Sequence, residues 1–195
     1  MDPLEAFELG VRRGDREILA GVDLRVHGGQ ILHLLGHNGA GKTSLLEVLC
    51  GLRAPSAGRL SGQPPVNRLH WLGHRNGVKA SLSPLENLRF SCRLAGAPLA
   101  GVAPALERVG LQRLRHRPCG RLSTGQRRRA GLARLLVDER PWWFLDEPLA
   151  GLDVAGIALV CDLLAEHVAT GGAAVVSSHQ PFPKPLPGLM EQVLA

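Results

Sequence analysis

One segment, Gly36-His37-Asn38-Gly39-Ala40-Gly41-Lys42-Thr43, fits the pattern G-x-x-x-x-G-K-[ST]. The apolar run Ile31–Leu35 precedes it, and from Ser44 onward the apolar residues follow with helical spacing. Strand, glycine-rich turn and helix in this order are the context in which the pattern forms a phosphate-binding loop. The glycines let successive backbone N–H groups face a polyphosphate, and the helix N-terminus adds partial positive charge. The sequence therefore predicts a nucleoside triphosphate site on an α/β core.

The nucleotide-binding prediction assigns a role to each part of this loop. Lys42 is expected to reach the β- and γ-phosphates, and the hydroxyl of Thr43 to contact Mg²⁺. The backbone of the loop and of the first helical turn is expected to surround the phosphates. The predicted nucleotide-binding residues are Gly36, His37, Asn38, Gly39, Ala40, Gly41, Lys42, Thr43 and Ser44.

Two carboxylates and a histidine follow other apolar runs of the chain. Asp146 and Glu147 come directly after Trp142–Leu145, which is typical of a strand buried on both faces. Asp146 suits the metal that accompanies a bound triphosphate, and Glu147 is expected to act as general base toward the attacking water. His179 follows the apolar run Ala173–Ser177, at the sheet edge where ligands bind in open α/β folds. We expect His179 to hydrogen-bond the γ-phosphate.

A further segment, Leu122-Ser123-Thr124-Gly125-Gln126, precedes a stretch with helical content. Ser123 occupies the position of a helix N-cap. A serine and a glycine at a helix N-terminus are suited to gripping phosphate oxygens. This segment lies far along the chain from Lys42, so the sequence alone does not say which phosphate it would contact.

Composition limits the remaining possibilities. The chain has 195 residues and a formal net charge of +6, and its length predicts a single domain with one sizeable α/β core. The N-terminus, Met1–Glu5, lacks a hydrophobic segment, so we expect no signal peptide, and no apolar run is long enough for a membrane span. Any membrane role is therefore expected to come through a partner.

The cysteines and the remaining apolar runs complete the expected architecture. No C-x-x-C pair occurs, so buried free thiols are expected rather than a zinc site or disulfides. Residues 4–35 predict an antiparallel β layer, Leu69–Gly73 a buried strand, and residues 82–114 a mostly helical insert. Asp153 is expected to cap a helix running to about Thr170.

Taken together, these motifs resemble those of the ATP-binding cassette (ABC) ATPases, in the same order, over about residues 4–180. Leu122–Gln126 resembles the L-S-G-G-Q signature, with Thr124 in place of a glycine, and Ala150–Asp153 is similar to the D-loop. The resemblance implies a P-loop NTPase of the ABC cassette type. Such a fold has a mostly parallel core sheet flanked by helices, an antiparallel β layer and a small helical subdomain, here at about 78–135 within one domain, 1–195.

The resemblance also implies the cofactors ATP and Mg²⁺ and an assembly in which two copies pair head to tail. The signature residues Ser123, Thr124, Gly125 and Gln126 of one copy would then contact the triphosphate held by the other, and Asp153 would be the D-loop residue. Two positions depart from the family. Arg13 stands where an aromatic residue usually stacks on adenine, and His74 or Arg75 stands where a glutamine usually relays to the membrane partner.

The loop around His74 is similar to that of one subfamily, the ATP-binding subunits of bacterial cytochrome c maturation. This resemblance implies a peripheral protein on the cytoplasmic face of the inner membrane. Its partners would be a CcmB-like integral-membrane permease with CcmC- and CcmD-like proteins. ATP hydrolysis would drive haem export or release of a haem-loaded chaperone.

Three other interpretations stay open at this point. The cassette could energise a different small-substrate permease, or it could be a non-transport ABC ATPase, although those usually carry two cassettes or a long insertion. A nucleic-acid-binding module would explain the net charge, but no basic stripe interleaved with aromatic residues occurs. We therefore expect no nucleic-acid partner.

Overall fold

A computed structural model describes residues 1–194 of the chain. The chain divides into two compact units, which we call the first and the second unit. The first unit contains Met1–Trp71, Pro141–Pro148 and the residues from Cys161 onward, and the second contains Leu72–Arg140 and Leu149–Val160. The assignment of residues 1–195 to one ATP-binding domain with a helical subdomain at about 78–135 stays a prediction.

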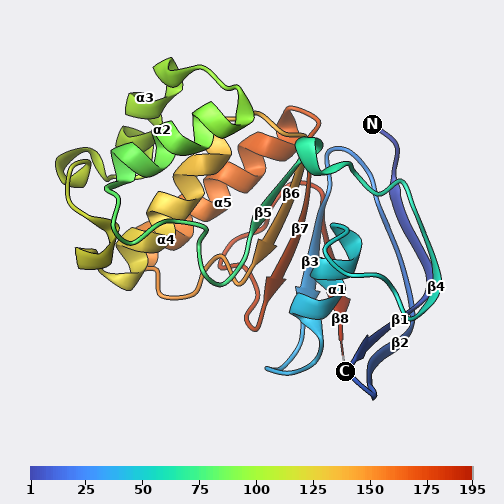
Figure 1. The fold of residues 1–195 in the computed structure, drawn as a ribbon. Coiled ribbons are helices and arrows are strands. Elements are labelled where there is room, and N and C mark those ends of the chain that lie inside the picture. The colour runs from blue at the N-terminus through green and yellow to red at the C-terminus, as the bar shows by residue number, and fades with distance from the viewer. Residues whose placement is uncertain (195) are drawn as a thin grey trace. The chain divides into compact units, whose positions relative to one another are not determined.

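A five-stranded sheet of order β5-β6-β7-β3-β8 forms the core of the first unit (Figure 1). Its strands, in that order, are Leu69–Leu72, Trp142–Asp146, Ala173–Ser178, Ile31–Leu35 and Leu189–Val193. The pairs β3–β7, β3–β8 and β6–β7 are parallel. Every residue of β6 and β7 is buried, as central strands of a parallel sheet require. The predicted α/β fold with a mostly parallel sheet is confirmed.

A second, antiparallel sheet has the order β2-β1-β4, with β1 at Leu4–Arg13, β2 at Arg16–Val26 and β4 at Ala57–Ser61. Helix α1, Lys42–Leu49, contacts β1 of this layer as well as β6 and β7 of the parallel sheet (Figure 1). The predicted β layer is therefore present, but its first two strands are longer than expected. Strand β4 was not predicted, because its glycine and its mostly exposed side chains give no alternation of buried and exposed residues.

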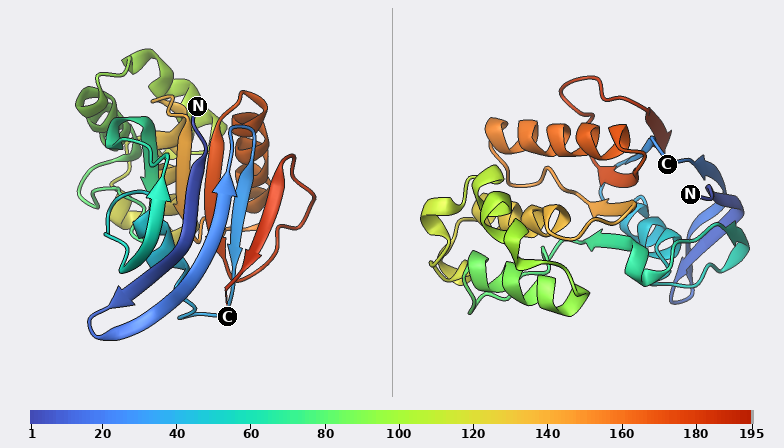
Figure 2. Two further views of the ribbon diagram at one scale, coloured as in Figure 1. Left: turned by 90° about the vertical axis from the view of Figure 1, so that its right-hand side faces the viewer. Right: turned by 90° about the horizontal axis from the view of Figure 1, so that it is seen from above.

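The last strand, β8, lies at the edge of the parallel sheet beside β3 (Figure 2). The segment before it contains prolines, which cannot donate to a ladder, and it is not part of any strand. After β8, the Leu194 N–H donates to the Leu35 carbonyl at 2.8 Å, and Leu194 is buried. The end of the described chain is thus fixed to the strand that leads into the phosphate loop.

Short helices make up most of the second unit (Figures 1 and 2). They are α2 at Pro84–Ala95, α3 at Val102–Arg108, α4 at Thr124–Leu132, and the 3-10 turns η2 at Leu99–Gly101, η3 at Gln112–Leu114, η4 at Cys119–Arg121 and η5 at Ala133–Leu136. The 3-10 turn η1, Val66–Arg68, belongs to the first unit, and α5, Val154–Ala169, begins in the second unit and continues into the first. The predicted helical character of residues 82–114 is confirmed.

The second unit contains a loop that is shaped by one side chain. Asn87, buried on α2, accepts from the Lys79 N–H at 2.8 Å and donates to the carbonyls of Lys79 and Ser83, each at 3.0 Å. Ser83 in turn caps α2 through a capping box with Glu86. The chain between the β5 end and α2 is therefore fixed by local hydrogen bonds rather than by regular structure.

All four cysteines are buried free thiols, as predicted: Cys50, Cys92, Cys119 and Cys161. Burial raises the pKa of Cys50 to about 11, so this thiol is protonated and unreactive at neutral pH. Among residues 1–194, no helix combines the length and the apolar character that crossing a membrane requires.

A histidine lies inside the parallel sheet. The His33 side chain on β3 is 0% exposed, and its ring centroid is 4.5 Å from that of Phe182. Its Nδ1 atom lies 3.6 Å from Oε1 of Glu191 on β8. Burial lowers the pKa of His33, although the Glu191 carboxylate acts in the opposite direction. His33 is therefore neutral in the folded protein at neutral pH.

We expect His33 to make the protein less stable in mild acid. Since its pKa is lower in the folded chain than in the unfolded one, the unfolded chain takes up the proton first as the pH falls through about 6.5. Above that pH the ionisation of His33 costs the folded protein no unfolding free energy, and below it the unfolding free energy falls. Thermal unfolding followed at about pH 7.5 and 5.5 should show a smaller acid-induced fall in Tm for His33→Leu than for the wild type. An equal fall in both proteins would contradict this role.

Candidate functional site

The phosphate loop has the backbone conformation that its glycines permit. Gly39 and Gly41 have φ angles of 93° and 91°, in the left-handed region, and Gly41 is the residue before α1. A Cβ atom on Gly41 would lie 2.7 Å from Cγ2 of Ile18, so a side chain is also excluded sterically. Strand β3, loop and α1 follow in the predicted order.

Lys42 lies inside this loop and is 6% exposed. Its Nζ atom donates to the carbonyls of Gly36 at 2.7 Å and His37 at 3.1 Å. The same atom is 3.5 Å from Oε1 of Glu147. The loop therefore holds a buried ammonium group with backbone oxygens and a carboxylate around it, at the position where a phosphate would enter.

Thr43 and Asp146 are brought together although 103 residues separate them. The Thr43 hydroxyl donates to Oδ1 and Oδ2 of Asp146 at 2.9 and 3.0 Å. Ser177, at the neighbouring position on β7, donates its hydroxyl to Oδ1 of Asp146 at 2.6 Å. Three oxygen-bearing side chains thus converge beside the phosphate loop, a donor set that suits a hard divalent cation.

Glu147 and His179 also meet at the carboxyl edge of the sheet. His179 Nδ1 lies 3.0 Å from Oε2 of Glu147, and the Glu147 side chain is 18% exposed. The backbone of Glu147 has φ +48°, which is a left-handed conformation that costs energy for a non-glycine residue. Hydrogen bonds from the Glu147 N–H to Ser177 Oγ at 3.0 Å and to its carbonyl at 3.1 Å hold this conformation.

Ser177 was not predicted as a site residue. It connects Asp146 with the backbone of Glu147, and its side chain is fully buried. The sequence places it in an apolar strand run, and a polar side chain at the end of a buried strand was the only available signal. Its partners lie about thirty residues away in sequence, so no local pattern identifies them.

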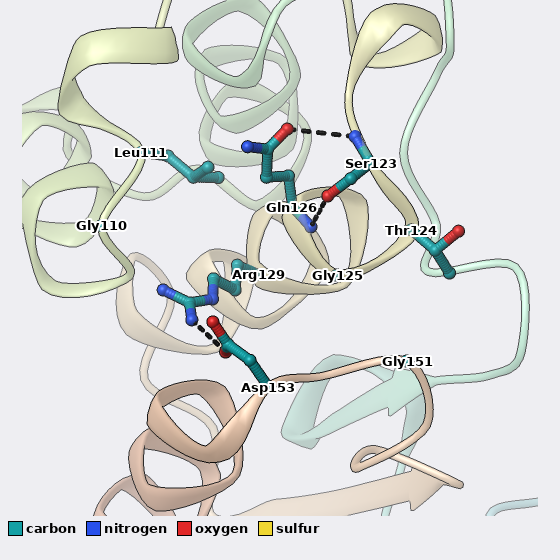
Figure 3. Close-up of a pocket in the computed structure, with 9 residues that line it drawn as sticks. All are labelled: Gly110, Leu111, Ser123, Thr124, Gly125, Gln126, Arg129, Gly151 and Asp153. Atoms are coloured by element: carbon teal, nitrogen blue, oxygen red, sulfur yellow. Dashed lines mark hydrogen bonds and ion pairs between the residues drawn. The ribbon is translucent and has the colours of Figure 1, made fainter.

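The predicted signature residues lie at the N-terminus of α4, in the second unit (Figure 3). Ser123 is the N-cap, as predicted: its Oγ accepts from the Gln126 N–H at 3.2 Å, and its N–H donates to Oε1 of Gln126 at 3.0 Å. A pocket of about 460 Å³ opens here, with Thr124, Gly125 and Gly151 in its lining. The helix N-terminus gives this pocket a positive potential.

Asp153 lies on the other side of the same pocket (Figure 3). It caps α5 as predicted, since its Oδ1 accepts from the Gly156 N–H at 2.8 Å. The same oxygen accepts from Nη2 of Arg129 at 2.5 Å. These two donors, the Gly156 N–H first, lower the pKa of Asp153. The signature turn and the segment that begins α5 are therefore joined by an ion pair.

Three predicted residues remain outside these two groups. Arg13 ends β1, opposite Arg16 on β2, and is exposed. His74 and Arg75 are exposed in the turn that follows β5, within the second unit. The structure thus brings Lys42, Thr43, Asp146, Glu147 and His179 together in the first unit. It gathers Ser123, Thr124, Gly125, Gln126 and Asp153 in the second.

Comparison with known proteins agrees with this geometry. A family model described as "ABC transporter" matches residues 19–150, which is more than half of the chain. This chain belongs to the ABC transporter family.

The chain is also similar over most of its length to curated relatives. One is the cytochrome c biogenesis ATP-binding export protein CcmA of Methylococcus capsulatus, with 47% identity over 188 residues, 91% of each chain. Another is the protein of the same name from Rhodopseudomonas palustris, with 46% identity over 176 residues, 87% of this chain and 88% of the relative.

Solved structures give the same fold. An ABC transporter ATP-binding protein from Pyrococcus furiosus superposes with a TM-score of 0.85 at 24% identity, over 99% of this chain and 98% of its own. CbiO1 of Clostridium perfringens, described as part of the ABC transporter complex cbiONQ, gives a TM-score of 0.74 at 27% identity, over 91% of this chain and 78% of its own. The predicted family and cassette fold are confirmed, and the chain is an ABC-type ATPase that works with a membrane permease.

Proposed function

We propose that this chain is the ATP-hydrolysing subunit of a membrane complex for cytochrome c biogenesis, with two ATP sites formed between two copies of the chain. The observation that carries the ATPase part is the convergence of Lys42, Thr43, Asp146, Glu147 and His179 around one loop. The assignment to cytochrome c biogenesis is supported by the 46–47% identity to CcmA proteins over nearly the whole chain.

The first step in this mechanism is phosphate binding. Lys42 exchanges its hydrogen bonds to the Gly36 and His37 carbonyls for the β- and γ-phosphate oxygens, and the loop N–H groups surround the same phosphates. Thr43 and Asp146, oriented by Ser177, are the residues that would hold Mg²⁺ next to these phosphates. The chemistry that Mg²⁺ would supply there is positive charge that offsets the negative charge developing on the phosphate oxygens.

Hydrolysis then depends on Glu147 and His179. The fixed left-handed backbone of Glu147 directs its carboxylate to the edge of the sheet, where it can accept a proton from the attacking water. His179, 3.0 Å from that carboxylate, orients it and can contact the γ-phosphate. Since Glu147 contacts both the Lys42 ammonium at 3.5 Å and His179 at 3.0 Å, the water and the phosphate would be positioned by the same three side chains.

The signature pocket supplies the second half of the site. Its helix N-terminus and its serine and glycine backbone suit an anion, and in our proposal this anion is the triphosphate held by the partner copy. Asp153 keeps the pocket in position through Arg129. Hydrolysis therefore requires two copies, and each copy contributes both kinds of half-site.

The coupled process is haem export or the release of a haem-loaded chaperone, on the cytoplasmic face of the inner membrane. The permease partner in this proposal is CcmB-like, with CcmC- and CcmD-like proteins in the same complex. His74 and Arg75, exposed in the turn after β5, and the helices of the second unit form the surface that we assign to this partner.

Affinity purification tests the proposed complex. The tagged chain is purified from membranes of its native host in mild detergent, and the co-purifying proteins are identified by mass spectrometry. We expect a small multi-span permease together with haem-handling membrane proteins. Recovery of a permease for another substrate would be consistent with ATPase activity but would contradict the assignment to cytochrome c biogenesis.

Ser177→Ala is expected to destabilise the first unit and to slow turnover. The substitution removes the Ser177 hydroxyl that donates to Asp146 and that accepts from the Glu147 N–H, which costs about 1–3 kcal/mol of unfolding free energy. Urea unfolding and steady-state phosphate release would measure the two effects. Ser61→Ala, at an exposed serine of β4, is the matched control and should change neither value. A Ser177→Ala protein of wild-type stability would contradict the proposed hydrogen-bond network.

A further inference from the structure

The signature helix carries three consecutive arginines, and each has a separate partner. Arg127 donates to the Leu122 carbonyl at 2.6 Å, which braces the turn before α4. Arg129 forms the ion pair with Asp153 described above. Arg128 points in a third direction, away from the signature pocket, and its contacts are not used by the proposed mechanism.

Arg128 is 3% exposed and reaches the loop that follows β5. Its Nη1 atom donates to the Gly73 carbonyl at 3.1 Å and to Oδ1 of Asn76 at 2.6 Å. A guanidinium group is costly to bury, so its hydrogen bonds at this position are required for it to stay there. Both acceptors are more than fifty residues away in sequence, and all three residues lie within the second unit.

The loop between Gly73 and Gly77 fits closely against α4. Asn76 and Gly77 have φ angles of 58° and 61°, so two successive residues adopt left-handed conformations. A Cβ atom on Gly131 of α4 would lie 2.9 Å from the Asn76 carbonyl oxygen, which leaves no room for a larger residue. Arg134, one turn further along, donates to the Gly77 carbonyl at 3.4 Å. The loop therefore cannot move along the helix without breaking these contacts.

This arrangement connects two functional segments. The N-terminus of α4 carries the signature turn, and the loop carries the exposed His74 and Arg75. We propose that Arg128 is a positioning residue. Its hydrogen bonds connect helix α4 to the loop 73–77, so that the position of this loop determines the position of the signature turn at the start of α4. The inference rests on the proposed function, in which the signature turn closes on ATP of a second copy.

The proposal makes a prediction that a purely structural role would not make. A change in the loop, at Asn76, should weaken ATP-driven pairing of two copies even though Asn76 is far from the signature turn in sequence. Binding of ATP to a single copy depends on the first unit and should not change. The two effects are separated by measuring ATP affinity at low protein concentration and dimer formation at high concentration.

The experiment uses Glu147→Gln as the parent, so that ATP is retained, and follows dimer formation by light scattering as ATP is titrated. Asn76→Gly removes the side-chain acceptor without straining the backbone, because glycine adopts a positive φ readily. We expect about a tenfold higher ATP concentration at half-maximal dimerisation, the effect of losing one hydrogen bond to a charged donor. Asn76→Asp keeps an acceptor and should stay close to the parent.

Arg128→Met also loses the hydrogen bond to the Gly73 carbonyl, so it should weaken dimerisation at least as much as Asn76→Gly does. The double variant should be no worse than Arg128→Met alone, because the Asn76 side chain acts through Arg128. Arg89→Met, which replaces an exposed arginine on α2, is the matched control and should behave as the parent. Additive effects, or dimerisation of Asn76→Gly equal to the parent, would overturn the proposal.

Failure of the proposed function gives a different result. If the Glu147→Gln parent itself does not form a dimer in ATP, the proposal that two copies share each ATP site is wrong. The positioning role of Arg128 is then tested by amide hydrogen exchange. Asn76→Gly should accelerate exchange at the amides of Gln126 and Arg127, in the first turn of α4, relative to Asn76→Asp. Unchanged exchange at those amides would overturn the positioning role independently of dimerisation.

Discussion

Glu147→Gln is expected to stop ATP turnover while ATP binding stays intact. Glutamine has nearly the same shape but cannot accept the proton of the attacking water, and a general base contributes roughly 10²–10⁴-fold to the rate. The fixed backbone at Glu147 and its contact with His179 at 3.0 Å place the amide where the carboxylate was. Phosphate release should fall about a thousandfold. Titration with a fluorescent ATP analogue should give an affinity equal to that of the wild type.

The same variant should accumulate as a dimer in ATP, because the sandwiched nucleotide is not cleaved. Glu17→Gln, at an exposed position of β2, is the matched control and should hydrolyse ATP at the wild-type rate. If Glu147→Gln turned over as fast as the control, the assignment of Glu147 as general base would be wrong.

Lys42→Ala is expected to have the largest effect on nucleotide affinity. The Lys42 ammonium is buried in the loop and already donates to two carbonyls there, at 2.7 and 3.1 Å. Without it, the β- and γ-phosphates lose charge-assisted hydrogen bonds, which corresponds to about a 100-fold higher Kd for ATP. Calorimetric titration with MgATP would measure this change directly.

The control for this variant is Lys184→Ala. Lys184 is exposed and forms an ion pair with Asp162 at 2.7 Å, an interaction of small energetic value on a protein surface. ATP affinity should not change in that protein. An equal loss of affinity in both variants would indicate a general effect of net charge rather than phosphate binding by Lys42.

The parts of the fold that were predicted from sequence are those with a local signal. The phosphate loop combines glycines at left-handed positions with an apolar strand before it and a helix after it, so Gly39 and Gly41 identify it directly. The helix starts at Ser123 and Asp153 were predicted for the same reason, since an N-cap needs only its own side chain and the next turn.

Two strands could not be predicted because their partners are distant in sequence. Strand β4, Ala57–Ser61, is mostly exposed and is defined by pairing with β1 rather than by its own pattern. Strand β8, Leu189–Val193, follows a proline-rich segment and becomes a strand only through its ladder with β3. In both cases the pairing, not the propensity, determines the structure.

The residues of the site also divide into those with a local sequence signal and those whose partners are distant in sequence. Lys42, Thr43, Asp146 and Glu147 belong to recognisable motifs, whereas Ser177 joins the site through contacts across neighbouring strands. Arg128 was visible only as one of three basic residues, and nothing in the sequence indicates that it is buried. Residues whose role is to hold others in place have no motif of their own, so a structure is needed to find them.

The most direct test of the account is the content of c-type cytochromes in the native host after deletion of this gene. We predict that covalently bound haem in membrane proteins, detected by peroxidase staining of denaturing gels, is lost on deletion. The wild-type gene should restore it, and the Glu147→Gln gene, expressed to the same level, should not. Normal c-type cytochromes in the deletion strain would contradict the proposed function.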